Sequence, residues 1–176
     1  HTNLIPMHLI MWLAIYTARR QEEICRMILT DYNADAAEWL IRDVKHPQGS
    51  LGNHKRFDVL PAALPVIEAL LCPDVQARMR PCNGIKGSLV PVKSQSISGA
   101  FTRACYVLGI EDLRFHDLRH EAATRLAEDG ATIPQIQRIT LHDSWNSLQR
   151  YVNLRRRGDR LDFAEAVATA REIYKI

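Results

Sequence analysis

The chain has 176 residues, which matches the length of about one domain. It is 47% hydrophobic and 24% charged, with 8 Gly and 8 Pro, and this ordinary globular composition excludes the collagen-like, low-complexity and largely disordered classes. The 23 Lys and Arg residues against 20 Asp and Glu residues give a formal charge of +3, which permits a nucleic-acid partner without requiring one.

The first apolar stretch, residues 4–16, predicts a buried helix rather than a membrane anchor or a signal peptide. It is too short to span a bilayer, contains Pro6 and His8, and has no basic flank before it. The four cysteines are scattered without a C-x-x-C pair, which argues against a disulfide framework or a zinc ribbon and favours reduced thiols. We therefore expect a cytoplasmic protein without membrane association.

The next segments predict a helix and then a β-hairpin. A second helix is expected over residues 21–29, where two glutamates in the first turn complement the helix dipole. Two extended stretches follow, residues 38–45 and 55–60, separated by the turn-rich residues 47–53. This pattern predicts a hairpin with a long tip.

The remainder of the chain is predicted to be mostly helical. Helical spacing of apolar residues resumes after Pro61 and is interrupted by a loop with several Pro and Gly residues, 72–92. The expected helices are 62–71, 94–108, 115–128, one lined by Ile133, Ile136 and Ile139, and 161–174. The predicted fold class is therefore α+β and mainly helical, a single domain with a small antiparallel hairpin or sheet at one edge.

The segment Phe115-His-Asp-Leu-Arg-His-Glu121 carries the most informative polar pattern. On a helix, His116 and Arg119 are i, i+3 neighbours, so an imidazole and a guanidinium face the same spot. Two donors are therefore expected to converge there.

Charged residues earlier in the chain add to this pattern. Arg20 lies at a predicted helix start and is followed by Glu23, and Lys45 and Lys55 flank the tip of the predicted hairpin. Taken singly, each of these residues is typical of an exposed surface. Their order along the chain, ahead of the His-x-x-Arg segment, is what makes them candidates for one site.

Tyr151 follows His142 by nine residues. On one uninterrupted helix, nine steps of about 100° would place the two side chains on opposite faces. Asp143, Ser144 and Asn146 are residue types that cap helices or form turns, so a break in this stretch is expected. With such a break, His142 and Tyr151 can reach one site.

Three segments together resemble the catalytic domain of the tyrosine recombinases, also called the phage integrase family. They are Thr17-Ala-Arg-Arg20-Gln-Glu-Glu23-Ile, similar to the family's Thr-Gly-x-Arg-x-x-Glu box; His116-Asp-Leu-Arg119-His-Glu-Ala-Ala-Thr, similar to its His-x-x-Arg box; and Thr140-Leu-His142 with Tyr151, similar to its Leu-Gly-His box and nucleophile. The resemblance covers nearly the whole chain. Ala18 and Leu141 depart from it, because glycine is usual at both positions, and the long hairpin tip leaves Lys45 and Lys55 as alternatives for the hairpin lysine.

The resemblance implies a DNA strand transferase in which Tyr151 attacks a phosphodiester and forms a 3′-phosphotyrosine, which a second strand's 5′ hydroxyl then reseals. Arg20 and Arg119 offset the charge on the phosphoryl oxygens, because each planar, permanently charged fork can hold two oxygens. Lys45, favoured over Lys55, protonates the leaving 5′ oxygen. No metal ion, ATP or other cofactor is expected. The remaining roles fall to His116 and His142, which align the phosphate or relay the tyrosine proton, and to Glu23, which holds Arg20 or its helix in place.

The resemblance also implies partners. These are double-stranded DNA and three further copies of the chain in a homotetramer on DNA, with a monomer expected for the isolated domain and a bacterial or phage origin. Family members usually carry a separate N-terminal DNA-binding domain, so we expect residues 1–176 to be the catalytic domain alone and to bind DNA weakly. Residues 161–176 are expected either to dock on a neighbouring protomer or to fold onto their own core. The target site and the direction of strand exchange are not predicted.

Two other functions compete with this interpretation. A zinc hydrolase could use His116 and His120 at i, i+4 with Asp117 as a base and His142 as a third ligand, although the usual base there is glutamate. A non-catalytic DNA-binding regulator could hold phosphates with the basic residues 155–160. A type IB topoisomerase shares the tyrosine chemistry, but the three boxes are more similar to those of bacterial and phage integrases.

Overall fold

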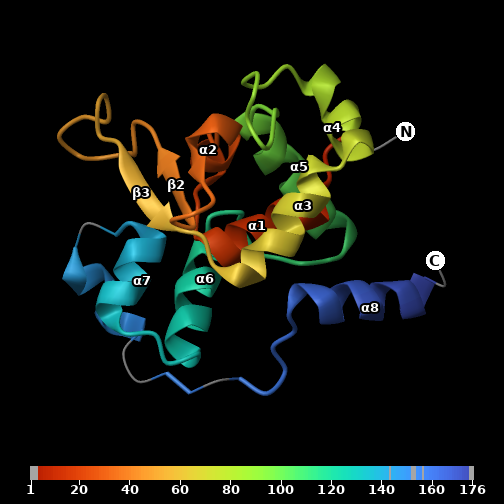
Figure 1. Cartoon of the computed structure of the whole chain (residues 1–176). Helices are drawn as coiled ribbons and strands as arrows, with labels where there is room; N and C mark the ends of the chain where they lie inside the picture. Colours follow the sequence, from red (N-terminus) through yellow and green to blue (C-terminus); the bar gives the residue numbers. More distant parts are fainter. Residues whose placement is uncertain (1–3, 143, 152–153, 156, 175–176) are drawn as a thin grey trace.

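The structure, a computed structural model, describes residues 4–142, 144–151, 154–155 and 157–174 and shows a group of helices with a small sheet at one side (Figure 1). Its elements are, in chain order, α1 (Met7–Thr17), α2 (Gln21–Cys25), η1 (Leu29–Asp31), β1 (Tyr32–Asn33), β2 (Glu38–Ile41), β3 (Lys55–Asp58), η2 (Pro61–Ala63), α3 (Leu64–Leu71), α4 (Pro73–Met79), η3 (Arg80–Cys82), α5 (Ser94–Val107), α6 (Asp117–Glu128), α7 (Ile133–Thr140), η4 (Trp145–Tyr151) and α8 (Phe163–Tyr174), where η marks a 3-10 turn. The predicted mainly helical α+β class with a small antiparallel sheet is confirmed. Within the described residues, no helix is both long and apolar enough to cross a bilayer.

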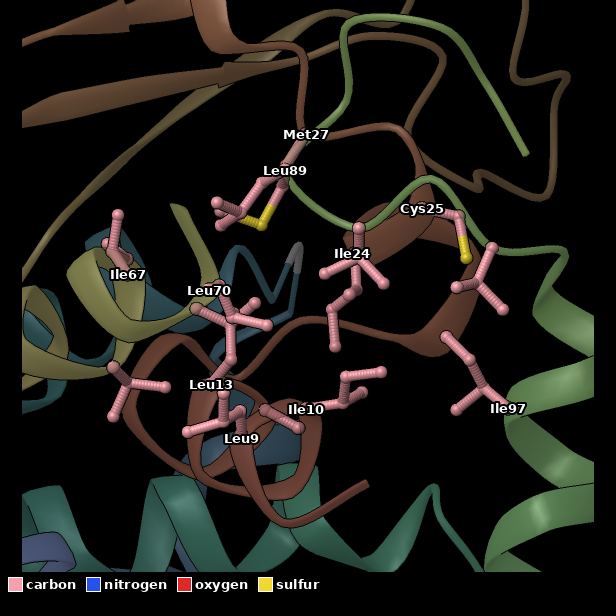
Figure 2. Packing of buried hydrophobic residues seen from close by; sticks show 14 of the residues in the cluster. Leu9, Ile10, Leu13, Ile24, Cys25, Met27, Ile67, Leu70, Leu89 and Ile97 are labelled. Carbon is pink, nitrogen blue, oxygen red and sulfur yellow. The ribbon is translucent and has the colours of Figure 1, made fainter. Parts of the chain in front are cut away.

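The main hydrophobic core forms around α1. This helix is almost entirely apolar and packs against α3, α5 and α6. Figure 2 shows Leu9, Ile10 and Leu13 of α1 among side chains from α2, α3 and α5, including Leu70 and Ile97, and all five are buried. Because burying one such side chain contributes about 1.5–3 kcal/mol, α1 holds in place the helices that carry the polar residues of the site.

The predicted hairpin is present as part of a three-stranded antiparallel sheet. The strand order is β1-β2-β3, and β3 packs against α7. Trp39 of β2 lies opposite Phe57 of β3, and both are buried together with Ile41. The first strand of the predicted hairpin, β2, ends at Ile41 rather than at residue 45 because Asp43 takes a positive φ of 52°, which breaks the extended backbone. The two-residue strand β1 is too short to show an alternating pattern in the sequence.

The helix expected over residues 21–29 ends at Cys25 instead. The residues that follow pair with distant loops: the carbonyl of Met27 accepts a hydrogen bond from the Leu89 amide at 2.8 Å. The carbonyl of Ile28 accepts one from the Trp39 indole at 2.9 Å. The Leu29 amide, which a helix running to residue 29 would have paired with the Cys25 carbonyl, donates instead to the Gly87 carbonyl at 2.9 Å.

The loop expected over residues 72–92 contains α4 and η3, so that prediction is wrong. Pro73 stands in the first turn of α4, where a missing N–H breaks no helical hydrogen bond, and Asp74 adds a favourable charge there. The Gln76 side chain donates to the carbonyls of Leu70 at 2.8 Å and Leu89 at 2.9 Å. The proline therefore starts a helix, which Gln76 fastens to the core.

Two helices that lead into the polar site end at residues with positive φ. Ala18 (φ 55°) terminates α1, and Leu141 (φ 55°) terminates α7. Left-handed backbone costs an L-residue roughly 1–2 kcal/mol, which is why glycine is the usual residue in such a cap. These are the two positions at which the sequence departs from the recombinase pattern, and the backbone nevertheless makes the glycine-type turn. Arg20 and His142 follow these turns within two residues.

Candidate active site

Arg20 stands at the N-terminus of α2 and is paired with Glu23, one turn later. Nη1 of Arg20 donates to Oε1 of Glu23 at 2.8 Å, and the Arg20 backbone amide donates to Oε2 at 3.2 Å. Burial alone would raise the pKa of the Glu23 carboxyl, but the neighbouring arginine guanidinium groups outweigh it and hold that pKa below its usual value. Glu23 is buried and Arg20 is partly exposed, so the carboxylate orients Arg20 while part of its guanidinium stays accessible.

Arg19 belongs to the same cluster, although the sequence did not single it out. Its side chain is 1% exposed, and its guanidinium stacks over the Phe57 ring at 4.5 Å. Nη2 donates to the Ile139 carbonyl at 2.6 Å, and Nε donates to the Thr17 carbonyl at 2.9 Å. Nη1 lies 3.3 Å from Oε2 of Glu23. Arg19 therefore connects the start of α2 to the end of α7.

Arg119 projects from α6 into this cluster. It is 2% exposed, and its Nη1 donates to the Ala18 carbonyl at 2.6 Å. Its Nη2 is also buried and finds no hydrogen-bond partner in the part of the chain that the structure describes. Burial, with the positive charges of Arg19 and Arg20, lowers the pKa of Arg119 to about 9. The structure thus brings Arg20 and Arg119 close enough to interact electrostatically.

His142 lies directly after the turn at Leu141. Its Nδ1 is 2.7 Å from Oγ1 of Thr140, and its carbonyl accepts a hydrogen bond from Gln137 at 2.9 Å. Burial, followed by the positive charges of the arginine cluster, lowers the pKa of His142 to about 4. His142 is therefore a neutral imidazole at pH 7, placed beside the arginines.

The predicted break between His142 and Tyr151 is present. The chain leaves α7 at Leu141 and reaches Tyr151 at the end of the 3-10 turn η4, while Asp143 lies outside the described residues. The Tyr151 ring is buried in a small cluster with Ala123, Ile136 and Leu148, which joins η4 to α6 and α7. The ring is therefore fixed by packing.

The hydroxyl of Tyr151 meets His120, which the sequence suggested only as a zinc ligand. Oη of Tyr151 lies 2.8 Å from Nδ1 of His120. His116, the residue just before α6, faces His120 edge-on with the ring centroids 5.5 Å apart. Burial, His120 and nearby arginines lower the pKa of His116. The i, i+4 spacing of the two histidines was the available signal, but the contact with Tyr151 depends on the break after α7.

The two candidate lysines have different surroundings. Lys45 is exposed on the long connection between β2 and β3. Lys55 begins β3 and lines a hollow of about 440 Å³ together with Gln137, Leu141 and His142. Lys55 therefore lies on the side of the sheet that faces the His142 turn.

The basic residues 155–160 make ion pairs within the chain. Arg157 pairs with Glu128 at 2.6 Å, and Arg160 pairs with Asp129 at 2.7 Å and Glu128 at 3.2 Å, all on or just after α6. Arg156 lies outside the described residues, and Arg155 is exposed. Two of the cations on which a phosphate-holding regulator would depend are therefore engaged by carboxylates, and this alternative gains no support.

The zinc-hydrolase alternative also gains no support. Across the residues that the structure describes, no three His, Cys, Asp or Glu side chains are grouped so that they could hold a metal ion. His120 instead contacts Tyr151, and His142 contacts Thr140.

Known proteins match this chain in sequence. A family model for the phage integrase family matches residues 1–157. The shufflon-specific DNA recombinase of Escherichia coli is 31% identical over 157 residues, which are 86% of this chain and 35% of that protein. The integrase of Salmonella phage P22 is 35% identical over 72 residues, 41% of this chain and 19% of its own length. The chain thus spans about a third of the shufflon recombinase.

Solved structures match the fold. XerA recombinase superposes with a TM-score of 0.60 at 19% identity, covering 97% of this chain and 57% of its own. The Tn1549 transposon integrase in complex with a circular intermediate DNA gives a TM-score of 0.64 at 14% identity, covering 96% of this chain and 58% of its own. Because the family match runs from residue 1 to residue 157 and includes the segments that carry all the arginines, histidines and the tyrosine described above, the chain belongs to the phage integrase family of tyrosine recombinases.

Proposed function

We propose that this chain is the catalytic domain of a site-specific DNA recombinase that cleaves and rejoins DNA through a bond between Tyr151 and phosphate. The proposal rests on Arg119. An unpaired donor on a buried guanidinium costs about 1–3 kcal/mol, and Nη2 of Arg119 has no partner among the described residues, beside the partly exposed Arg20. A phosphodiester supplies the charged oxygen that this donor lacks.

The proposed reaction assigns a role to each group of the cluster. Oη of Tyr151 forms a bond to phosphorus as the bond to the 5′ oxygen breaks, and the 3′ end stays attached to the tyrosine. Arg20 and Arg119 hold the non-bridging oxygens, whose charge grows in the transition state. The neutral His142 donates a hydrogen bond to the same phosphate. The step needs neither a metal ion nor ATP, because fixed cations provide the electrostatic stabilisation.

The leaving 5′ oxygen needs a proton, and a hairpin lysine can supply it. We propose Lys45, which is exposed on the connection between β2 and β3, with Lys55 beside the His142 hollow as the alternative. Glu23 acts through Arg20, because both of its oxygens contact that residue. Rejoining is the reverse reaction, with a 5′ hydroxyl attacking the phosphotyrosine.

The larger assembly is also part of the proposal. The relatives include integrases solved with DNA, such as the Tn1549 enzyme, which supports double-stranded DNA as the partner. We infer a homotetramer on that DNA in the bacterial cytoplasm, a monomer in its absence, and a separate DNA-binding domain in the complete enzyme. Helix α8 is the blue helix at the lower right of Figure 1, to the right of α6. It is anchored at Phe163, whose amide donates to the Tyr16 hydroxyl at 2.8 Å, and the rest of α8 is largely exposed and available to a neighbouring copy.

Covalent capture tests the proposal on DNA of any sequence. The protein is incubated with nicked duplexes of random sequence, and adducts that survive detergent are isolated, sequenced and mapped by mass spectrometry. We expect an adduct at Tyr151 that disappears in Tyr151→Phe while non-covalent DNA binding persists. Tyr106→Phe, at an exposed tyrosine of α5, is the matched control and should retain the adduct. An adduct that survives Tyr151→Phe, or none with the unaltered protein, contradicts the proposal.

A further inference from the structure

We propose that His120 is a further catalytic residue, which accepts the proton of Tyr151 during cleavage and returns it during rejoining. This inference rests on the proposed DNA cleavage and adds the acceptor that the reaction requires. It replaces the expectation that His116 or His142 relays this proton.

The geometry places His120 in contact with the reacting atom. Nδ1 of His120 lies 2.8 Å from Oη of Tyr151, within the distance at which a base can take a proton directly. Both groups are fixed, because His120 is on α6 next to the buried Arg119 and the Tyr151 ring is packed in its own apolar cluster. Nδ1 of His142, by contrast, is engaged by Thr140 at 2.7 Å.

The tyrosine needs such an acceptor. Burial raises the pKa of the Tyr151 phenol, and the opposing effects of Arg150 and Arg119 do not cancel it. The phenol therefore keeps its proton at neutral pH and cannot attack phosphorus as a phenolate unaided. Because Tyr151 is only 5% exposed, bulk water is a poor competitor for this role.

The proton balance is complete within the site. In cleavage, the Tyr151 Oη–H bond breaks and its proton moves to Nδ1 of His120, while Oη forms a bond to phosphorus and the 5′ oxygen leaves with a proton from the hairpin lysine. In rejoining, the incoming 5′ hydroxyl gives its proton to the neutral lysine, and the His120 imidazolium protonates the departing tyrosine. No oxidant, metal ion or nucleotide enters either step.

The test measures single-turnover cleavage of a nicked duplex whose sequence was identified by covalent capture with the unaltered protein. His120→Gln keeps a polar side chain of similar reach but cannot accept the proton, and we expect it to slow cleavage about 100-fold or more while DNA affinity stays within about twofold. In His120→Ala, added imidazole should restore part of the rate, and substituted imidazoles of higher basicity should restore more. His8→Gln, which removes an exposed imidazole on α1, is the matched control and should cleave at the unaltered rate.

The outcomes separate the two proposals. If the unaltered protein forms no tyrosine adduct, the proposed function fails. If it forms one and His120→Gln cleaves at the same rate, or His120→Ala is slow and no imidazole restores it, His120 is not the acceptor. A second measurement needs no folded His120 variant: the ¹⁵N resonance of His120 Nδ1 should move on Tyr151→Phe, and an unchanged resonance overturns the inference.

Discussion

Replacing Arg19 with methionine tests whether a buried cation holds the two halves of the site together. The Arg19 side chain donates to the carbonyls of Thr17 and Ile139 and lies beside Glu23. Methionine fills a similar volume and still packs on Phe57, but it donates nothing. The variant leaves two buried carbonyl oxygens without a donor and removes one of the arginines beside Glu23, which keeps its pair with Arg20.

The magnitude follows from those two oxygens. Each buried acceptor left without a donor costs about 1–3 kcal/mol, and the relief of burying a cation offsets part of this. We expect Arg19→Met to lower the free energy of unfolding by about 3 kcal/mol, which corresponds to a fall in melting temperature of about 6–12 °C for a chain of this size. Because the Ile139 carbonyl is three residues before His142, cleavage should also slow at temperatures at which the variant remains folded.

Thermal melting by circular dichroism and the single-turnover cleavage assay measure the two effects. Arg103→Met is the control: Arg103 lies exposed on α5, so its melting temperature should be almost unchanged. If Arg19→Met melts with the unaltered protein, the buried hydrogen bonds do not carry the assigned energy. If it is destabilised but cleaves normally, Arg19 does not position His142.

Three further variants test other features of the structure. His142 has a folded-state pKa of about 4 against an ordinary 6.5, so the unfolded chain binds a proton first as the pH falls. Urea unfolding should therefore show a loss of stability between pH 7 and 5 that is smaller by about 1 kcal/mol in His142→Gln, allowing for partial exposure, and an equal loss in both proteins would contradict this assignment. Ala18→Gly should change the melting temperature little, because the relief of left-handed backbone strain (about 1 kcal/mol) is balanced by the loss of a buried methyl group (about 0.8 kcal/mol). Ala18→Val should lower the melting temperature markedly, and equal effects of the two variants would refute the strain argument. Glu128→Gln removes a buried partner of Arg157 and Arg160, and should speed hydrogen exchange in residues 157–163 while leaving exchange in α1 unchanged. Unaltered exchange in residues 157–163 would show that these ion pairs do not hold the segment.

The sequence predicted the features that local spacing controls. The i, i+3 spacing predicted the helix that carries Arg119, although α6 begins at Asp117 and His116 is the residue just before it. The turn residues after His142 indicated a break before Tyr151, and the extended stretches predicted the hairpin. Each of these depends on residues close together in the chain.

Local patterns in the sequence could not predict contacts between residues that lie far apart in the chain. No local pattern singled out Arg19, yet it donates to the carbonyl of Ile139, 120 residues away, and stacks on Phe57 of β3. The Leu29 amide likewise donates to the distant Gly87 carbonyl and not to a carbonyl of α2. His120 and Tyr151 are 31 residues apart and meet only because η4 folds back on α6. One sequence contains the residues for these contacts but no signal that pairs them.

The ion pairs that bind Arg157 and Arg160 to the end of α6 have a practical consequence for any assay of this enzyme. Added salt weakens partly exposed charge pairs, and it also weakens the attraction of a basic protein to DNA. Because the first effect loosens the segment just downstream of the nucleophile, the cleavage rate of already bound DNA should itself depend on ionic strength. Titrations in potassium chloride therefore have to measure affinity and bond breaking separately, since a single salt curve would merge a loss of binding with a loss of tyrosine alignment.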